Sequence, residues 1–86
     1  MAAVLQIRKG MPVRGSQGAK LGVVDEVTTD AVSGQPTAFV VKSGFWILAK
    51  RKILNVDMIR QINHDPDSII VKIRKKEFRG IPELAD

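Results

Sequence analysis

The sequence predicts an all-β protein, a small antiparallel barrel of about five to six strands with at most one short helical turn near the C-terminus. Short runs of Val, Ile, Leu and Phe recur along the chain, and turn-forming residues separate them at intervals of about eight to twelve residues. Glycines lie within or beside several of these runs, as the bent strands of a small barrel require. A chain of 86 residues has the length of one domain, so we assign residues 1–86 to a single domain.

Residues 10–30 organise the prediction, because two apolar runs there flank the turn cluster Arg14-Gly15-Ser16-Gln17-Gly18. This pattern predicts a strand over residues 11–14, a tight connection and a long strand over residues 20–30. Gly22 lies inside the long run, where a residue without a side chain lets the strand bend or approach a neighbour closely. We expect structural roles for four glycines: Gly10, Gly18, Gly22 and Gly44.

Asp25 conflicts with a regular strand. It is in phase with Leu21, Val23 and Val27, so strict alternation would bury its carboxylate, which is costly without a partner. We therefore expect a β-bulge near Val24 and Asp25 that turns Asp25 outward.

The second half of the chain predicts further short strands. After a turn at residues 33–36, residues 37–43 are mostly apolar on both faces, so this strand is central or partly covered on both sides. Residues 50–52 are interpreted as a charged hairpin tip, residues 53–56 as the returning strand, and Asp57 as the cap of a single helical turn.

The last predicted strand covers residues 68–74. Its residues Ile69, Val71 and Ile73 share the inward face. Residues 75–79 then predict one helical turn, which Gly80 and Pro82 end.

Three stretches resemble the PRC-barrel domain family. Residues 10–13 with 18–24 resemble its opening strand, turn and second strand, residues 37–44 its third strand, and residues 53–59 with 62–63 the segment before its last strand. The resemblance covers residues 7–75, with one departure: Asn55 stands where the family commonly has proline. It implies a compact six-stranded barrel used as an interaction module, as in a ribosome maturation factor, in the photosynthetic reaction centre H subunit and in small stand-alone proteins. It supplies no catalytic or ligand residues.

Composition narrows the function classes. The formal net charge of +5, from 14 basic and 9 acidic residues, favours anionic partners or simply a soluble basic protein. No cysteine is present, which excludes disulfides and cysteine-based metal sites and fits a reducing compartment. We see no secretory signal and no apolar run long enough to span a bilayer, so we expect a cytoplasmic protein without a membrane span.

Signals for catalysis are weak. His64 lies beside Asp65 and Asp67, which suggests either a metal or base site or, as we favour, a solvated turn. The acidic residues of 25–30 could serve acid–base chemistry, but they fit an exposed strand face better. No phosphate-binding, dinucleotide-binding or metal-spacing motif occurs, so we expect no enzyme, no cofactor and no small-molecule substrate.

One patch interleaves basic and aromatic residues and could bind RNA. In the alternative interpretation, the aromatic side chains lie in the core and the cations form a solvated hairpin tip. The candidate basic patch is Lys42, Lys50, Arg51 and Lys52, beside Phe45 and Trp46. If it binds nucleic acid, the chain is an RNA- or ribosome-associated accessory factor.

Four consecutive large apolar residues predict an interface. A strand in a single-layer barrel sends alternate side chains outward, so two of the four leave the core. The predicted interface residues are Phe45, Trp46, Ile47, Leu48 and Arg51. We expect a homodimer through residues 44–54, or docking on an unidentified protein partner. The competing expectation is that residues 2–7 or 78–84 fold over this surface and cover it.

Overall fold

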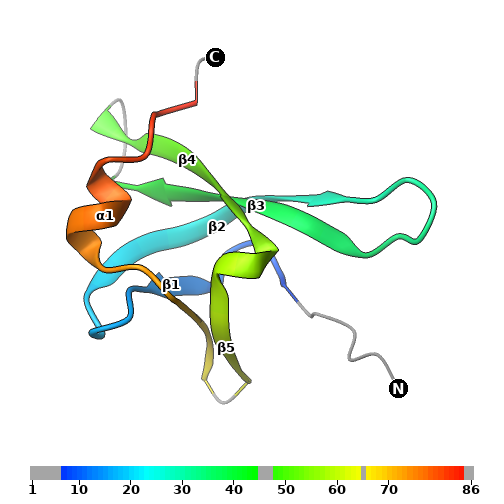
Figure 1. The fold of residues 1–86 in the computed structure, drawn as a ribbon, viewed down its shortest axis with the longest axis horizontal. Coiled ribbons are helices and arrows are strands. Elements are labelled where there is room, and N and C mark those ends of the chain that lie inside the picture. The colour runs from blue at the N-terminus through cyan, green and yellow to red at the C-terminus, as the bar shows by residue number, and fades with distance from the viewer. Residues whose placement is uncertain (1–6, 45–47, 65, 85–86) are drawn as a thin grey trace.

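The computed structural model describes residues 7–44, 48–64 and 66–84, and the elements in this part of the chain are shown in Figure 1. Six strands and two short helices follow in the order β1 (Pro12–Arg14), β2 (Lys20–Thr29), β3 (Pro36–Ser43), β4 (Lys50–Asn55), η2 (Val56–Met58), β5 (Ile59–His64), β6 (Asp67–Val71) and α1 (Lys75–Arg79). The predicted all-β class and the single short C-terminal helical turn are confirmed.

The strands form one sheet in the order β4-β3-β2-β1-β6-β5. All neighbouring strands are antiparallel except β1 and β6, which run parallel, with Val13 opposite Ile69. The predicted antiparallel sheet therefore contains one parallel pair. Parallel pairing needs a long connection, and the four strands between β1 and β6 supply one. The curled sheet is barrel-like but not closed, because no ladder joins its edge strands β4 and β5, which η2 connects along the chain.

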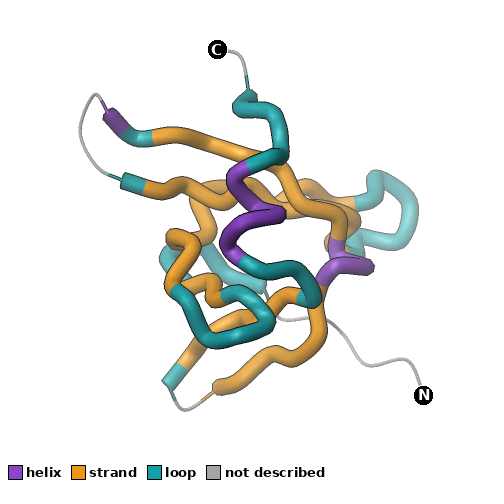
Figure 2. The backbone as a smooth tube through the Cα atoms, turned by 60° about the vertical axis from the view of Figure 1, so that its left-hand side comes forward, coloured by secondary structure: helices purple, strands orange, loops and turns teal. Residues whose placement is uncertain are grey.

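The core lies on the concave side of the curled sheet. α1 lies across one open end of this sheet, and its Phe78 is 4% exposed within the core cluster (Figure 2). As predicted, Ile69 and Val71 point inward and are fully buried, and Ile73 packs against the same core. The core residues with the least exposure are Val13, Val24, Phe39, Val41, Ile69 and Val71.

The predicted bulge is present in β2. Val24 pairs with Val41 and Glu26 pairs with Val40, so Asp25 is the extra residue and its side chain leaves the core. At Gly22, β2 crosses β3 so closely that an added Cβ would lie 2.3 Å from the carbonyl oxygen of Lys42. A side chain at Gly22 would therefore force the two backbones apart.

The remaining glycines that we singled out lie at connections. Gly10, Gly18 and Gly44 have φ values of 93°, 87° and 77°. Gly44 follows directly after β3, and this left-handed conformation starts the connection to β4.

Two local predictions are wrong. Residues 50–52 are not a hairpin tip, because Lys50, Arg51 and Lys52 pair with Ser43, Lys42 and Val41 as the first half of β4. The cap of η2 is Asn55 and not Asp57: the Asn55 side-chain oxygen accepts a hydrogen bond of 3.0 Å from the Asp57 amide. The φ of Asn55, −73°, is close to the value that a proline ring would fix, so the asparagine keeps a backbone that suits proline.

Candidate functional site

Side chains of β4 alternate between two surfaces of the sheet. Lys52 and Leu54 point to the core side, and they are 6% and 3% exposed. Arg51 and Ile53 point to the opposite side, where Ile53 is 43% exposed. Two neighbouring cations of the predicted basic patch therefore lie on different sides of the sheet.

The convex side of β3 and β4 carries Ile53, one of the exposed large apolar residues. We call the surface formed by Ala38, Val40, Lys42, Arg51 and Ile53 the outer face. Val40 and Ile53 are directly opposite each other on the paired strands, so their side chains are in contact distance. Val40 is itself 4% exposed but lies outside the main core cluster, and β3 lies between β4 and β2, as predicted for a central strand.

The predicted interface residues meet this outer face only in part. Arg51 belongs to the outer face. Leu48 precedes β4 and is 79% exposed. Phe45, Trp46 and Ile47 lie outside the described residues.

Arg51 forms an ion-pair network on the outer face. Its Nε lies 2.9 Å from Asp25 Oδ2, and its Nη2 donates a hydrogen bond of 3.1 Å to Glu26 Oε2. The Nε contact is an ion pair without the alignment of a hydrogen bond. Because the three side chains are 25–64% exposed, water screens these pairs and each stabilises the fold by at most about 1 kcal/mol. The bulge at Asp25 thus supplies a carboxylate to neutralise Arg51.

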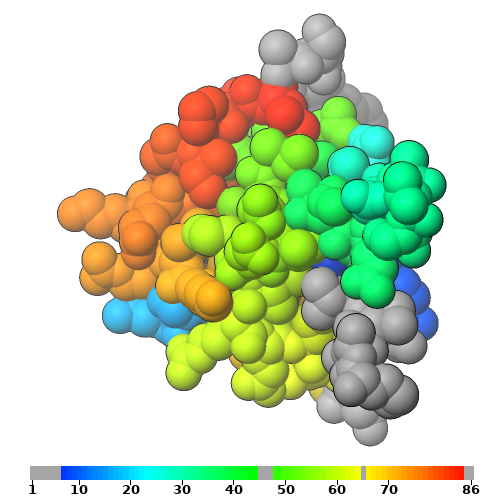
Figure 3. Space-filling model, turned by 45° about the vertical axis from the view of Figure 1, so that its right-hand side comes forward, coloured from blue at the N-terminus to red at the C-terminus, as the bar shows by residue number. Residues whose placement is uncertain are grey.

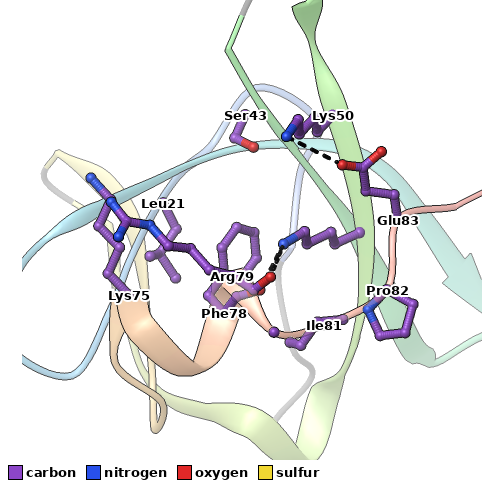
Figure 4. Close-up of a pocket in the computed structure, with 11 residues that line it drawn as sticks. Leu21, Ser43, Lys50, Lys75, Phe78, Arg79, Ile81, Pro82 and Glu83 are labelled. Atoms are coloured by element: carbon purple, nitrogen blue, oxygen red, sulfur yellow. Dashed lines mark hydrogen bonds and ion pairs between the residues drawn. The ribbon is translucent and has the colours of Figure 1, made fainter.

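Lys52 is the largest correction to the predicted basic patch. Its Nζ donates hydrogen bonds to the carbonyl oxygens of Phe78 (2.9 Å) and Arg79 (3.0 Å) and lies 4.9 Å from the centroid of the Phe78 ring (Figure 4). These carbonyls end α1, where a cation is favourable. Lys52 is therefore an internal cap of α1 and is not available to a phosphate.

The other two patch cations are also separated. Lys42 is opposite Arg51 on the outer face, whereas Lys50 is on the core side of β4 and pairs with Glu83, with 3.4 Å between Nζ and Oε1. The structure does not bring Lys42, Lys50, Arg51 and Lys52 together as one surface.

The residues after α1 cover the free edge of β4. The Leu84 amide donates a hydrogen bond of 2.7 Å to the Arg51 carbonyl, and Figure 3 shows the C-terminal residues in orange and red beside the green surface of β4. Residues 78–84 thus lie along this edge and beside Lys52, whereas residues 2–6 and 45–47, which the competing expectation also involves, lie outside the described residues. Leu48 of the predicted interface stays 79% exposed, and Ile53 on the outer face stays 43% exposed.

A groove of about 650 Å³ lies between α1, the residues that follow it and the ends of β2, β3 and β4 (Figure 4). We call it the C-terminal groove. Its lining residues are Leu21, Ser43, Lys50, Lys52, Lys75, Phe78, Arg79, Gly80, Ile81, Pro82 and Glu83. Sequence reasoning missed this groove, because its residues come from four separate parts of the chain.

The residues weighed for catalysis have structural partners where the structure describes them, which excludes Asp65. Asp30 Oδ1 accepts hydrogen bonds from the amides of Val32 (2.7 Å) and Ser33 (3.0 Å), so it forms the turn between β2 and β3. The Ser33 amide, followed by that of Val32, lowers the pKa of Asp30 from its usual value. His64 Nδ1 lies 3.8 Å from Asp67 Oδ1 across the β5–β6 hairpin. Among the described residues, no three His, Asp or Glu side chains are grouped as a metal site.

Neither helix in the described part of the chain has the length and apolar composition needed to cross a membrane. A search of curated proteins finds no match to the chain. A model of the PRC-barrel domain matches residues 9–78, which is most of the sequence and includes all six strands of the curled sheet. With its barrel-like sheet and this match, the chain belongs to the PRC-barrel domain family.

Proposed function

We propose that this chain is a non-catalytic protein-interaction module that self-associates through the outer face of β3 and β4. The observation that carries the proposal is the exposure of Ile53. This large apolar residue lies within β4, and it is 43% exposed. Burying it against a partner would remove apolar surface from water, which is the main driving force of association.

The surroundings of Ile53 have the composition of an interface. Val40 adjoins it as an apolar neighbour, and Arg51 lies one step along the strand on the same face. Leu48 precedes β4 and follows the apolar residues 45–47 in the sequence. Apolar centres beside arginine and aromatic residues are typical of protein interfaces.

The arrangement favours contact between faces over pairing between strand edges. The edge of β4 already accepts a hydrogen bond from Leu84 at Arg51, so a second copy cannot add a strand there without displacing it. A two-fold axis through the outer face would instead place Ile53 near its symmetry mate. The homodimer is thus proposed as a face-to-face assembly. We also propose a cytoplasmic location, which the cysteine-free sequence supports.

Light scattering behind a sizing column tests the assembly. We expect a dimer at tens of micromolar and a monomer for Ile53→Asp, since a carboxylate at the interface centre would lose its hydration. Val32→Asp is the matched control, because Val32 is 97% exposed at the β2–β3 turn, away from the outer face. Trp46→Asp extends the test to residues 45–47. A monomeric wild-type chain, or a dimer that Ile53→Asp leaves intact, would contradict the proposal.

An RNA-binding role has less support. Lys52 is buried, and Arg51 is paired with two carboxylates, so the predicted basic patch loses half of its cations. A pull-down from lysate with and without nuclease separates the two functions. Partners that remain bound after nuclease treatment favour the interaction module.

A further inference from the structure

We propose that the C-terminal groove binds an acidic peptide segment of a partner protein. This inference rests on the proposed role as an interaction module, but it concerns a surface separate from the outer face. It assigns a chemical class of partner to a groove that is not part of the proposed self-association surface.

Unpaired cations surround the groove. Lys75 and Arg79 are exposed on α1, and neither forms an ion pair with any residue that the structure describes. A shallower hollow continues from the groove past Leu21, Ser43 and Lys75 and adds Lys20 at its far side. Among the described residues that line either hollow, Glu83 is the single acidic one. The surplus of positive charge selects a negatively charged occupant.

The chain itself shows a carboxylate in this groove. Glu83 Oε1 lies 3.4 Å from Lys50 Nζ, and Figure 4 shows this pair at one end of the groove, with Lys75 toward the other end. The two side chains are 62% and 53% exposed, so their ion pair is weak and a carboxylate from a partner can replace Glu83.

Apolar residues favour a peptide over a free anion. Ile81 and Pro82 line the groove and are not fully buried, so they offer apolar contacts that a small inorganic ion cannot use. The volume of about 650 Å³ lies within the range of ligand sites, roughly 300–1,000 Å³. A short segment that combines acidic and apolar side chains satisfies both kinds of lining residue.

The same residues disfavour nucleic acid. Base stacking needs an exposed aromatic face. Phe78 is the aromatic residue among the described residues that line the groove, and it is 4% exposed with the Lys52 ammonium against its ring. An RNA strand would find cations here but no described aromatic surface on which to stack.

Fluorescence polarisation with a short labelled peptide of mixed glutamate and leucine tests the proposal on the full chain. We expect saturable binding that weakens with salt, and none to a matched peptide with lysine in place of glutamate. The double substitution Lys75→Glu and Arg79→Glu should weaken binding by about tenfold or more, because both unpaired cations become repulsive. The matched control is Arg60→Glu with Lys72→Glu, which makes the same charge change at exposed residues that do not line the groove.

Three outcomes would overturn the proposal: no binding of the acidic peptide, equal losses in the two double variants, or tighter binding of single-stranded oligouridine through the same cations. A measurement without substitutions guards against misfolding of the variants. On titration of the acidic peptide into the wild-type chain, the amide resonances of Ser43, Lys75 and Arg79 should shift more than those of Arg60 and Lys72. A reversed pattern would equally contradict the proposal.

The two proposals fail separately. The double substitution at Lys75 and Arg79 leaves the outer face unchanged, so light scattering should still report a dimer. If the acidic peptide does not bind while Ile53→Asp still gives a monomer, the groove proposal is wrong and the self-associating module stands.

Discussion

Arg51 and Lys52 are neighbours in the sequence with opposite environments. Arg51 lies on the outer face, where it pairs with Asp25 and Glu26 and stays in contact with water. Lys52 lies on the core side, where it is 6% exposed and bonds to two backbone carbonyls of α1. The alternation of a β-strand thus assigns one cation to a surface that can face a partner and the next to the internal closure of the fold.

This difference shows that the two sides of β4 serve separate purposes. Interactions on the outer face are exposed and replaceable, which suits an interface. On the core side, the hydrogen bonds of the buried Lys52 join the sheet to the end of α1. Substitutions should therefore affect stability on the core side and association on the outer face.

The largest expected effect lies where β2 crosses β3. Gly22→Ala should lower the free energy of unfolding by about 3 kcal/mol, because the new Cβ would lie 2.3 Å from the Lys42 carbonyl oxygen and the backbones must separate. Gly80→Ala is the matched control, since its Cβ would meet only the Glu77 carbonyl oxygen at 3.4 Å. Urea unfolding of both variants measures the difference. Equal losses would mean that the close approach at Gly22 is not a constraint.

The second prediction tests the comparison itself. Lys52→Ala should lower the free energy of unfolding by about 2 kcal/mol, because it leaves the Phe78 and Arg79 carbonyls without their donor in a buried place. Arg51→Ala should cost less than about 1 kcal/mol, since it removes only screened ion pairs. The same unfolding experiment compares the two variants. If Arg51→Ala proved the more destabilising, our assignment of roles to the two faces would be wrong.

The features that could be predicted from the sequence are those that depend on the alternation of inward and outward residues within one strand. Asp25 could be placed outside the core because a buried carboxylate is costly, and the bulge follows from that cost. Residues 37–43 could be recognised as a central strand because mostly apolar residues fill both phases of the strand. Such signals need only the residue types within one strand.

Features that depend on distant residues were missed. Lys52 is in phase with Leu54 on the core side, but a lysine in that phase is favourable only because the carbonyls that end α1 lie nearby. A run of three cations therefore looked like a solvated tip. The parallel pairing of β1 with β6 and the C-terminal groove likewise arise from segments far apart in the chain.

The smallest predicted effect is a loss of folding stability at acidic pH. Hydrogen bonds from the backbone amides lower the pKa of Asp30 below its usual 3.8, with Ser33 contributing most and Val32 next. The hydrogen bond from the Arg74 amide is the main cause that lowers the pKa of Glu77 below its usual 4.5. A lowered pKa in the folded state means that the ionised group stabilises the fold above the usual pKa, and that this stabilisation disappears as the pH falls through the folded value. The loss should therefore occur below about pH 4.

Asp30→Asn isolates one of these groups. The asparagine oxygen can accept the same two hydrogen bonds, so the turn should persist at neutral pH while the charge is lost. Thermal melts between neutral pH and about pH 2 should show a flatter acid dependence for the variant than for the wild type. Parallel curves would show that the Asp30 charge does not contribute.

Methyl resonances of the wild-type chain, recorded from micromolar to millimolar concentration, test the central claim most directly. If the outer face is the self-association surface, the methyl groups of Ile53 should shift with concentration, while those of Ile81 in the C-terminal groove stay fixed. Shifts at Ile81 without shifts at Ile53, or none at any concentration, would contradict the assignment of the outer face as the interface.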